Sequence, residues 1–265
     1  MPDRHPYLDG PHPRAYAHRG WHLGDLAGCE NTLAAFARAV DEGFGYLELD
    51  VHTTADGVAV VHHDPTLDRT TDGSGPIAAL RAAELAAVRV AGREPVPTLA
   101  DVFTALPRTR ITVELKSLAS VEPVLAVLER LDAWDRVCVG SSDEASLRVA
   151  RRRAGPRLFT SLGMLSAVAL RTRAWVDALP GRLSTLPTPP FRGGLAQLPR
   201  AHGPLTVVDP GLLRTAGRAG LEVHVWTVDD PTEMSELLSM GVDGLISNRP
   251  DLLRDMLVAR DRWAG

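Results

Sequence analysis

Residues 46–52 read Tyr-Leu-Glu-Leu-Asp-Val-His and lead into an Ala-Asp-Gly turn at 55–57. A short, partly apolar run before a turn predicts a β-strand. Side chains alternate along a strand, so Glu48, Asp50 and His52 face one side and the apolar residues between them face the other. Two carboxylates on one face repel each other unless something compensates their charge. We therefore expect a divalent cation here rather than the solvated face of an edge strand.

Strand and helix patterns alternate on both sides of this stretch. Strands are expected at 14–17, 46–52, 58–62, 111–116, 137–141, 158–161, 222–228 and 244–247, and helices at 33–42, 98–106, 121–131, 144–154, 164–174, 212–219, 231–240 and from 250 onward. This alternation predicts an α/β protein with a parallel sheet and helical crossovers. About eight such units in about 250 residues predict one (β/α)8 barrel of the TIM type. The chain has no G-x-G-x-x-G fingerprint that would favour two Rossmann-like halves.

The barrel is expected to form a single domain over residues 1–265, with a small insertion after the second strand at about 66–97. That segment looks loop-like, contains the breaker Asp-Gly-Ser-Gly at 72–75, and holds one short helix at 81–88. Residues 180–204 are rich in Pro and Gly and resist assignment, apart from a candidate strand at 183–186.

The composition is that of an ordinary globular protein, with 45% hydrophobic and 23% charged residues. A net charge of -4 argues against a nucleic-acid partner. Two cysteines make no disulfide framework and favour a reducing compartment. The first 17 residues lack the apolar core of a signal peptide, and no uncharged run approaches the roughly 20 residues that span a bilayer. We therefore expect a cytoplasmic protein without stable membrane insertion, and its oligomeric state stays open.

Reactive side chains gather at the carboxyl ends of the expected strands, where barrel active sites lie. The set comprises His18, Arg19, Glu48, Asp50, His63, Glu114, Lys116 and Trp226. Such groups at one end of different strands make a poor core but a good site for a metal and a phosphate. The imidazoles of His18 and His63 can exchange protons near neutral pH.

The charged members of this set divide by chemistry. Glu48, Asp50 and Glu114 offer oxygen ligands to one hard divalent cation, Mg²⁺ or Ca²⁺, and Mn²⁺ fits as well. Arg19 can bind a phosphate through two parallel hydrogen bonds, and Lys116 offers a compact positive charge. These residues therefore suit a metal and a phosphate group.

A series of motifs occurs in a fixed order along the chain. They are Ala17-His18-Arg19-Gly20, Glu30-Asn31-Thr32, Glu48-Leu49-Asp50-Val51, the run 63–73 that begins His63-Asp64-Pro65, Glu114-Leu115-Lys116, Val223-His224-Val225-Trp226, Gly241-Val242-Asp243-Gly244 and Arg249-Pro250-Asp251. Together they resemble the glycerophosphodiester phosphodiesterases over residues 15–116 and 222–252, and only weakly over 120–215. The resemblance implies a barrel enzyme of lipid metabolism that hydrolyses glycerophosphodiesters to glycerol 3-phosphate and an alcohol. It also implies that the partner is a small-molecule phosphodiester.

The resemblance also implies roles for individual residues. They are catalysis for His18 and His63, metal binding for Glu48, Asp50 and Glu114, and substrate binding for Arg19 and Lys116. His62 and His63 are neighbours on one strand, so only one of them faces the site, and the motif selects His63. Trp226 is interpreted either as a wall of the substrate site or as a plug of the barrel. Glu30 is interpreted as a cap or anchor of its turn, and a supporting role beside the site stays open.

Two alternatives remain open. A related barrel enzyme could act on lysophospholipids, as a phospholipase D-like enzyme or a phosphotransferase. A non-catalytic binder of phosphate ligands could keep the same fold, although mere binding does not need two titrating imidazoles. The attacking group, water or the glycerol 2-hydroxyl, and the head group of the substrate also stay open.

Overall fold

The computed structural model describes residues 4–179 and 191–264, so the candidate strand at 183–186 lies outside the described residues. Seven parallel strands form the main sheet in the order β7-β6-β2-β1-β12-β11-β8. The strands are β1 (Arg14–His18), β2 (Tyr46–Thr53), β6 (Arg110–Leu115), β7 (Val137–Gly140), β8 (Leu195–Pro199), β11 (Glu222–Trp226) and β12 (Gly244–Ser247). The predicted α/β class is confirmed.

Residues 159–161 connect the two edges of this sheet. Thr160 pairs in parallel with Val139 of β7, and Ser161 pairs in parallel with Leu195 of β8. The amide of Ser161 donates to the carbonyl of Val139 at 3.1 Å. The strand predicted at 158–161 therefore lies between β7 and β8, and the sheet curls into a TIM-like α/β fold.

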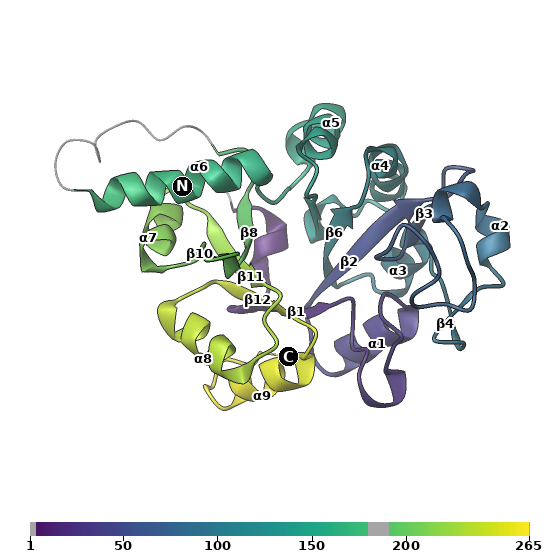
Figure 1. Cartoon of the computed structure of the whole chain (residues 1–265), viewed down its shortest axis with the longest axis horizontal. Helices are drawn as coiled ribbons and strands as arrows, with labels where there is room; N and C mark the ends of the chain where they lie inside the picture. Colours follow the sequence, from purple (N-terminus) through teal and green to yellow (C-terminus); the bar gives the residue numbers. More distant parts are fainter. Residues whose placement is uncertain (1–3, 180–190, 265) are drawn as a thin grey trace.

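Helices cover the outside of the strands (Figure 1). They are α1 (Leu33–Asp41), α3 (Leu99–Ala105), α4 (Val121–Arg130), α5 (Glu144–Ala154), α6 (Met164–Ala178), α7 (Pro210–Arg218), α8 (Pro231–Met240) and α9 (Pro250–Val258). Local chemistry fixes their starts: the Thr32 hydroxyl accepts from the Ala35 amide at 3.2 Å, and prolines open α7, α8 and α9. Helix α6 runs four residues past its predicted end. Among the described residues, no helix is both long and apolar enough to cross a membrane.

The alternation predicted for residues 46–52 sets the two faces of β2. Leu47, Leu49 and Val51 are fully buried in the main core, between the strands and the helices. Tyr46 points the other way and belongs to a second buried cluster with Tyr7 and Tyr16. The N-terminal arm contributes to this cluster through the 3-10 helix Pro6–Asp9. The interior next to the site is thus filled by aromatic side chains.

The segment 66–97 has more structure than a loop. Strand β3 (Ala59–Val61) pairs antiparallel with β2 before the segment begins. The segment then contains helix α2 (Ala82–Leu85), which is shorter than predicted, and a small hairpin of β4 (Arg89–Val90) and β5 (Glu94–Pro95) that the sequence pattern did not indicate. A separate small apolar cluster holds it together, formed by Val60, Leu67, Ile77, Leu85, Val90 and Val96. Figure 1 shows α2 and β4 at the opposite end of the molecule from α6 and α7.

Part of the region that resisted assignment forms a central strand. Strand β8 occupies residues 195–199, next to β11. A short hairpin of β9 (Ala201–His202) and β10 (Leu205–Thr206) follows. Two glycines precede β8, and a side chain at Gly194 would collide with the ring of Phe159. These glycines made the strand look like a loop in the sequence. In the fold they allow the chain to pack closely against Phe159.

Candidate active site

Three carboxylates meet at the carboxyl edge of the sheet because of strand register. The pairing of β1 with β2 sets His18 beside Glu48, and the pairing of β2 with β6 sets Asp50 beside Glu114. Adjacent strands lie roughly 5 Å apart. One ligand oxygen from each of Glu48, Asp50 and Glu114 lies within 4.8 Å of the others. The predicted convergence of these carboxylates is present.

The chemistry of this cluster fits a divalent cation. Glu48 is only 4% exposed, and its Oε2 atom accepts no hydrogen bond from the described residues. Burial, and then the charges of Asp50 and Glu114, raise the pKa of Glu48 well above its usual range. A buried carboxylate oxygen without a partner is costly, and oxygen is the ligand that hard divalent cations prefer. A bound cation would stabilise the ionised form of Glu48.

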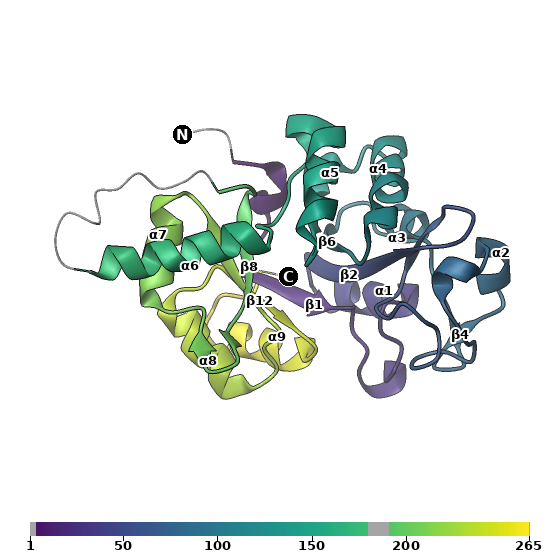
Figure 2. The same cartoon turned by 45° about the horizontal axis from the view of Figure 1, so that its top comes forward.

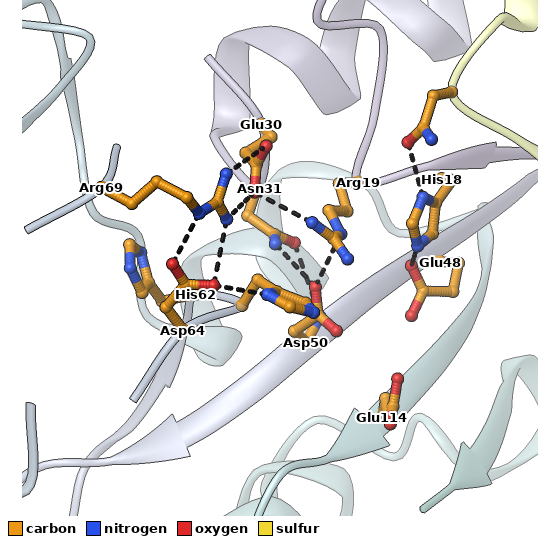
Figure 3. Close-up of polar contacts among 12 residues, drawn as sticks. His18, Arg19, Glu30, Asn31, Glu48, Asp50, His62, Asp64, Arg69 and Glu114 are labelled. Atoms are coloured by element: carbon orange, nitrogen blue, oxygen red, sulfur yellow. Dashed lines mark hydrogen bonds and ion pairs between the residues drawn. The ribbon is translucent and has the colours of Figure 1, made fainter. Parts of the chain in front are cut away.

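Asp50 binds the positive side chains of the site. Its Oδ1 atom lies 2.8 Å from Lys116 Nζ, and its Oδ2 atom lies 3.2 Å from Arg19 Nε and accepts a hydrogen bond from Asn31 Nδ2 at 2.8 Å. Burial alone would raise the pKa of Asp50, but Lys116 and Arg19 outweigh burial and lower it. Asp50 is therefore ionised and holds both cations beside the acid cluster. Figure 3 shows its contacts with Arg19 and Asn31.

Lys116 contacts a second member of the cluster, since its Nζ atom lies 3.1 Å from Glu114 Oε2. Burial lowers the pKa of Lys116, but the charges of Asp50 and Glu114 raise it by more.

The orientation of Arg19 is set by the turn after β1, where its own φ is 58° and that of Gly20 is 84°. A Cβ atom at Gly20 would lie 2.8 Å from the backbone of Ala35, so only glycine fits that turn.

His18 is held by an amide. Its Nδ1 atom lies 2.6 Å from Asn248 Oδ1, and Asn248 Nδ2 donates to Asp229 Oδ2 at 2.9 Å (Figure 3 shows the contact at His18). Because the amide oxygen can only accept, His18 carries its proton on Nδ1. Its Nε2 lone pair then faces Glu48, whose Oε2 atom lies 3.5 Å away. Burial, and then the charge of Arg19, lower the pKa of His18 to about 4.

His63 has a carboxylate partner instead. Its Nδ1 atom lies 2.6 Å from Asp64 Oδ1, and Asp64 Oδ2 accepts from Arg69 Nε at 2.6 Å. Arg69 also donates to Glu30 at 2.8 Å, and Glu30 accepts from Arg19 at 3.1 Å. The hydrogen bonds and charge of Arg69 hold the pKa of Asp64 well below its usual range. Figure 3 shows this chain of ion pairs from Asp64 to Arg19.

The neighbouring His62 lies apart from this network. It is 3% exposed, its amide donates to the carbonyl of Asp50, and its Nε2 atom lies 3.2 Å from the carbonyl of Thr66. His63, by contrast, keeps a third of its side chain exposed. The two imidazoles therefore have different surroundings, as expected for adjacent residues.

Trp226 ends β11 and is 44% exposed, so its interpretation as a plug of the barrel is wrong. A plug would be enclosed by the strands, whereas this ring lies at the surface. His224, two residues earlier, is fully buried between Tyr16 and Glu222, each 3.0 Å from one ring nitrogen. A role for Trp226 as a substrate wall stays a prediction.

Sequence reasoning did not single out Asn248, Asp229, Arg69 or Asp64 as parts of the site. Asn248 directly follows the last residue of β12, and its place at a strand end was a usable signal. Glu30 was interpreted mainly as an anchor of its turn, with a supporting role beside the site left open, and it joins Arg19 to Arg69.

One edge of this TIM-like barrel carries clustered carboxylates, two cationic side chains and histidines. These are the groups expected in an enzyme that cleaves phosphodiesters. The chain belongs to the glycerophosphoryl diester phosphodiesterase family, whose sequence model matches residues 16–252. The resemblance of the motifs is thereby confirmed, and the chain is an enzyme of the phosphoric diester hydrolase class.

Individual relatives agree. The chain is 38% identical to the probable glycerophosphodiester phosphodiesterase 2 of Mycobacterium tuberculosis over 95% of this chain and 93% of the relative. It is 30% identical to a glycerophosphodiester phosphodiesterase of Caldanaerobacter subterraneus over 89% of this chain and 96% of the relative. A solved Oleispira antarctica phosphodiesterase, in complex with the product sn-glycerol-3-phosphate, superposes with a TM-score of 0.75 at 23% identity, covering 93% of this chain and 97% of that one. This last likeness supports the fold.

Proposed function

We propose that the enzyme uses a divalent cation to hydrolyse glycerophosphodiesters to glycerol 3-phosphate and an alcohol. The observation that carries the proposal is the cluster of Glu48, Asp50 and Glu114, whose ligand oxygens lie within 4.8 Å of one another beside Lys116 and Arg19. Membership of the family supports the substrate class. The Oleispira phosphodiesterase supports the product, because its structure contains sn-glycerol-3-phosphate.

Glu48, Asp50 and Glu114 would hold the cation, Mg²⁺ or Ca²⁺, with Mn²⁺ as a further candidate. When bound, the cation supplies positive charge that polarises a phosphoryl oxygen. Arg19 and Lys116 bind the remaining phosphate charge, and Asp50 keeps both side chains in place.

The two histidines divide the proton transfers according to their partners. His18 carries its proton on Nδ1 toward Asn248, so its Nε2 atom accepts the proton of the attacking hydroxyl, whether water or the glycerol 2-hydroxyl. The carboxylate of Asp64 lies 2.6 Å from Nδ1 of His63 and fixes the orientation of the ring. We assign to His63 the donation of a proton to the leaving alkoxide. Trp226, exposed at the end of β11, forms a wall for the substrate.

The enzyme is proposed to be a single (β/α)8 domain over residues 1–265, with residues 66–97 inserted after the second strand. The parallel bridges at 160 and 161 support eight strands, and the separate apolar cluster of the segment supports the insertion. A cytoplasmic place in lipid metabolism, without a nucleic-acid partner, is likewise proposed. Two buried cysteines that form no disulfide and a net charge of -4 support it.

The decisive experiment measures release of glycerol 3-phosphate from glycerophosphocholine, with and without EDTA. We expect release that EDTA abolishes and an added divalent cation restores. Release that persists in EDTA would contradict the cation, and no release from any glycerophosphodiester would contradict the substrate class. Faster release of choline from lysophosphatidylcholine than from glycerophosphocholine would favour the phospholipase D-like alternative.

A further inference from the structure

Helix α6 turns several of its apolar side chains outward. All of its exposed side chains are uncharged: Met164, Leu165, Val168, Thr172, Trp175 and Ala178, followed by Leu179 at the cap. Leu165 is 67% exposed and Val168 is 56% exposed, although surface helices normally bury such residues. We call these seven exposed residues, from Met164 to Leu179, the α6 face. Figures 1 and 2 show the helix at the periphery of the molecule, beside α7.

The charged residues of α6 point the other way. Arg171 is 5% exposed, forms an ion pair with Asp209 at 2.8 Å and lies 5.0 Å from the ring of Trp175. Arg173 pairs with Asp177 at 2.8 Å, and both of these side chains are largely buried. Both faces of the helix are therefore unusual, because its two arginines are largely buried while Leu165, Val168 and Trp175 are exposed to solvent.

Positive charge borders the α6 face. A hollow of about 410 Å³ beside Leu165 and Phe191 is also lined by Arg148 and Arg192. The one carboxylate in this lining, that of Glu144, lies 3.6 Å from Arg151. Among the described side chains, none forms an ion pair with Arg148 or Arg192. The rim of an apolar surface is thus basic in a chain whose net charge is -4.

We propose that the α6 face docks on the surface of an anionic lipid bilayer. Outward leucine, valine and tryptophan side chains with flanking arginines are the composition of an interfacial helix. A second copy bound through the same face would bring arginines close to arginines, whereas anionic head groups neutralise them.

The place of α6 in the fold gives this docking a consequence. The helix begins three residues after Ser161, at the carboxyl end of the segment 159–161. Carboxyl ends of parallel strands share one edge, and that edge carries the acid cluster. Docking through the N-terminal turn of α6 would therefore bring the candidate active site close to the lipid surface. The docking itself does not rest on the proposed function.

The test is co-sedimentation of the full chain with vesicles of equal parts phosphatidylcholine and phosphatidylglycerol, and with vesicles of phosphatidylcholine alone. We expect binding to the mixed vesicles that weakens with added salt. The double variant Leu165→Glu/Val168→Glu should lower the affinity more than about tenfold. Arg148→Glu and Arg192→Glu should each lower it about fivefold or more. The matched control is Val258→Glu, a residue 53% exposed on α9, which should bind like the wild type.

Three outcomes would overturn the inference. They are no sedimentation of the wild type, equal binding by the double variant, and equal binding to uncharged vesicles. Sedimentation velocity must run in parallel, since a dimer that the double variant dissociates, without vesicle binding, would assign the α6 face to a second copy. Hydrolysis of dissolved glycerophosphocholine should be unchanged in the double variant. Vesicle binding without any hydrolysis would contradict only the proposed function.

Discussion

His18 and His63 differ in the groups that hold their Nδ1 atoms, and this difference supports different proposed roles for the two rings in proton transfer. Nδ1 of His18 donates to the amide oxygen of Asn248, and burial and the charge of Arg19 lower the pKa of this ring to about 4, whereas Nδ1 of His63 faces the carboxylate of Asp64. Arg69 holds that carboxylate in turn. These different partners support the proposed roles of His18 as the base and His63 as the acid.

Replacing either histidine should remove one proton transfer. We expect His18→Ala and His63→Ala each to lower kcat by about two to four orders of magnitude in the glycerol 3-phosphate assay. The control is His202→Ala, at an exposed position of β9, which should retain full activity. Near-normal turnover by either alanine variant would refute the assigned role.

Asn248 should matter through the orientation of His18. Asn248→Ala frees the Nδ1 atom of His18 and should lower kcat by about ten- to a hundredfold, the usual cost of losing such an orienting partner. KM should change little, because no substrate contact is lost. A matching loss in Asp229→Asn, which disturbs the same amide, would support the relay. Unchanged kcat in a folded Asn248→Ala variant would exclude it.

The sequence allowed the acidic cluster to be predicted, but not the contact of Asn248 with His18 or that of Arg69 with Glu30. Glu48 and Asp50 share a strand face by simple alternation, and Glu114 joins them because adjacent parallel strands end at one edge. Asn248 reaches His18 across 230 residues of chain, and Arg69 reaches Glu30 across 39. Local pattern can place Asn248 at a strand end, but it does not say which side chain Asn248 contacts, because such contacts depend on how distant loops dock.

At the scale of elements, alternating strands and helices were predictable wherever the hydrophobic period was uninterrupted. Helices α4 and α5 and strand β7 are close to their predicted bounds. Strand β8 was not predictable, because the glycines and prolines around it are typical of loops. The hairpin of β4 and β5 was missed since two-residue strands leave no period to read.

Strand β11 should make stability depend on pH through His224. Burial lowers the pKa of His224 from 6.5 to about 3, and the nearby Glu222 does not reverse this because the buried Arg14 already neutralises it. Between pH 6.5 and about 3 the unfolded chain therefore holds a proton that the folded chain does not. The free energy of unfolding should fall as pH falls through that range, by up to about 1.4 kcal/mol per pH unit from this group.

Denaturant titrations of the wild type and His224→Asn over this range measure the effect. The variant should show a shallower dependence of the free energy of unfolding on pH, since one titrating group is gone. Identical dependence in the two proteins would show that His224 is protonated in the folded state.

At the scale of the whole molecule, the barrel brings together side chains from both ends of the chain. His18 comes from β1, Glu114 from β6 and Asn248 from the loop after β12, and ring closure through 159–161 fixes their relative positions. A cation at their centre would bind only this folded arrangement.

Cation binding should therefore stabilise the folded enzyme. Mg²⁺, Ca²⁺ or Mn²⁺ at about 100 times its dissociation constant should add about 2.7 kcal/mol to the free energy of unfolding. Glu114→Gln should lose this gain, whereas Glu122→Gln, an exposed acid on α4, should keep it. Equal stabilisation of both variants by the cation would place its binding outside the acid cluster.

The most direct measurement is an anomalous difference map from crystals grown with Mn²⁺. The proposed site predicts one strong peak about 2.0–2.6 Å from oxygens of Glu48, Asp50 and Glu114, and its loss in the Glu114→Gln variant. A map of catalytically active crystals with no peak among these three carboxylates would contradict the cation-assisted mechanism.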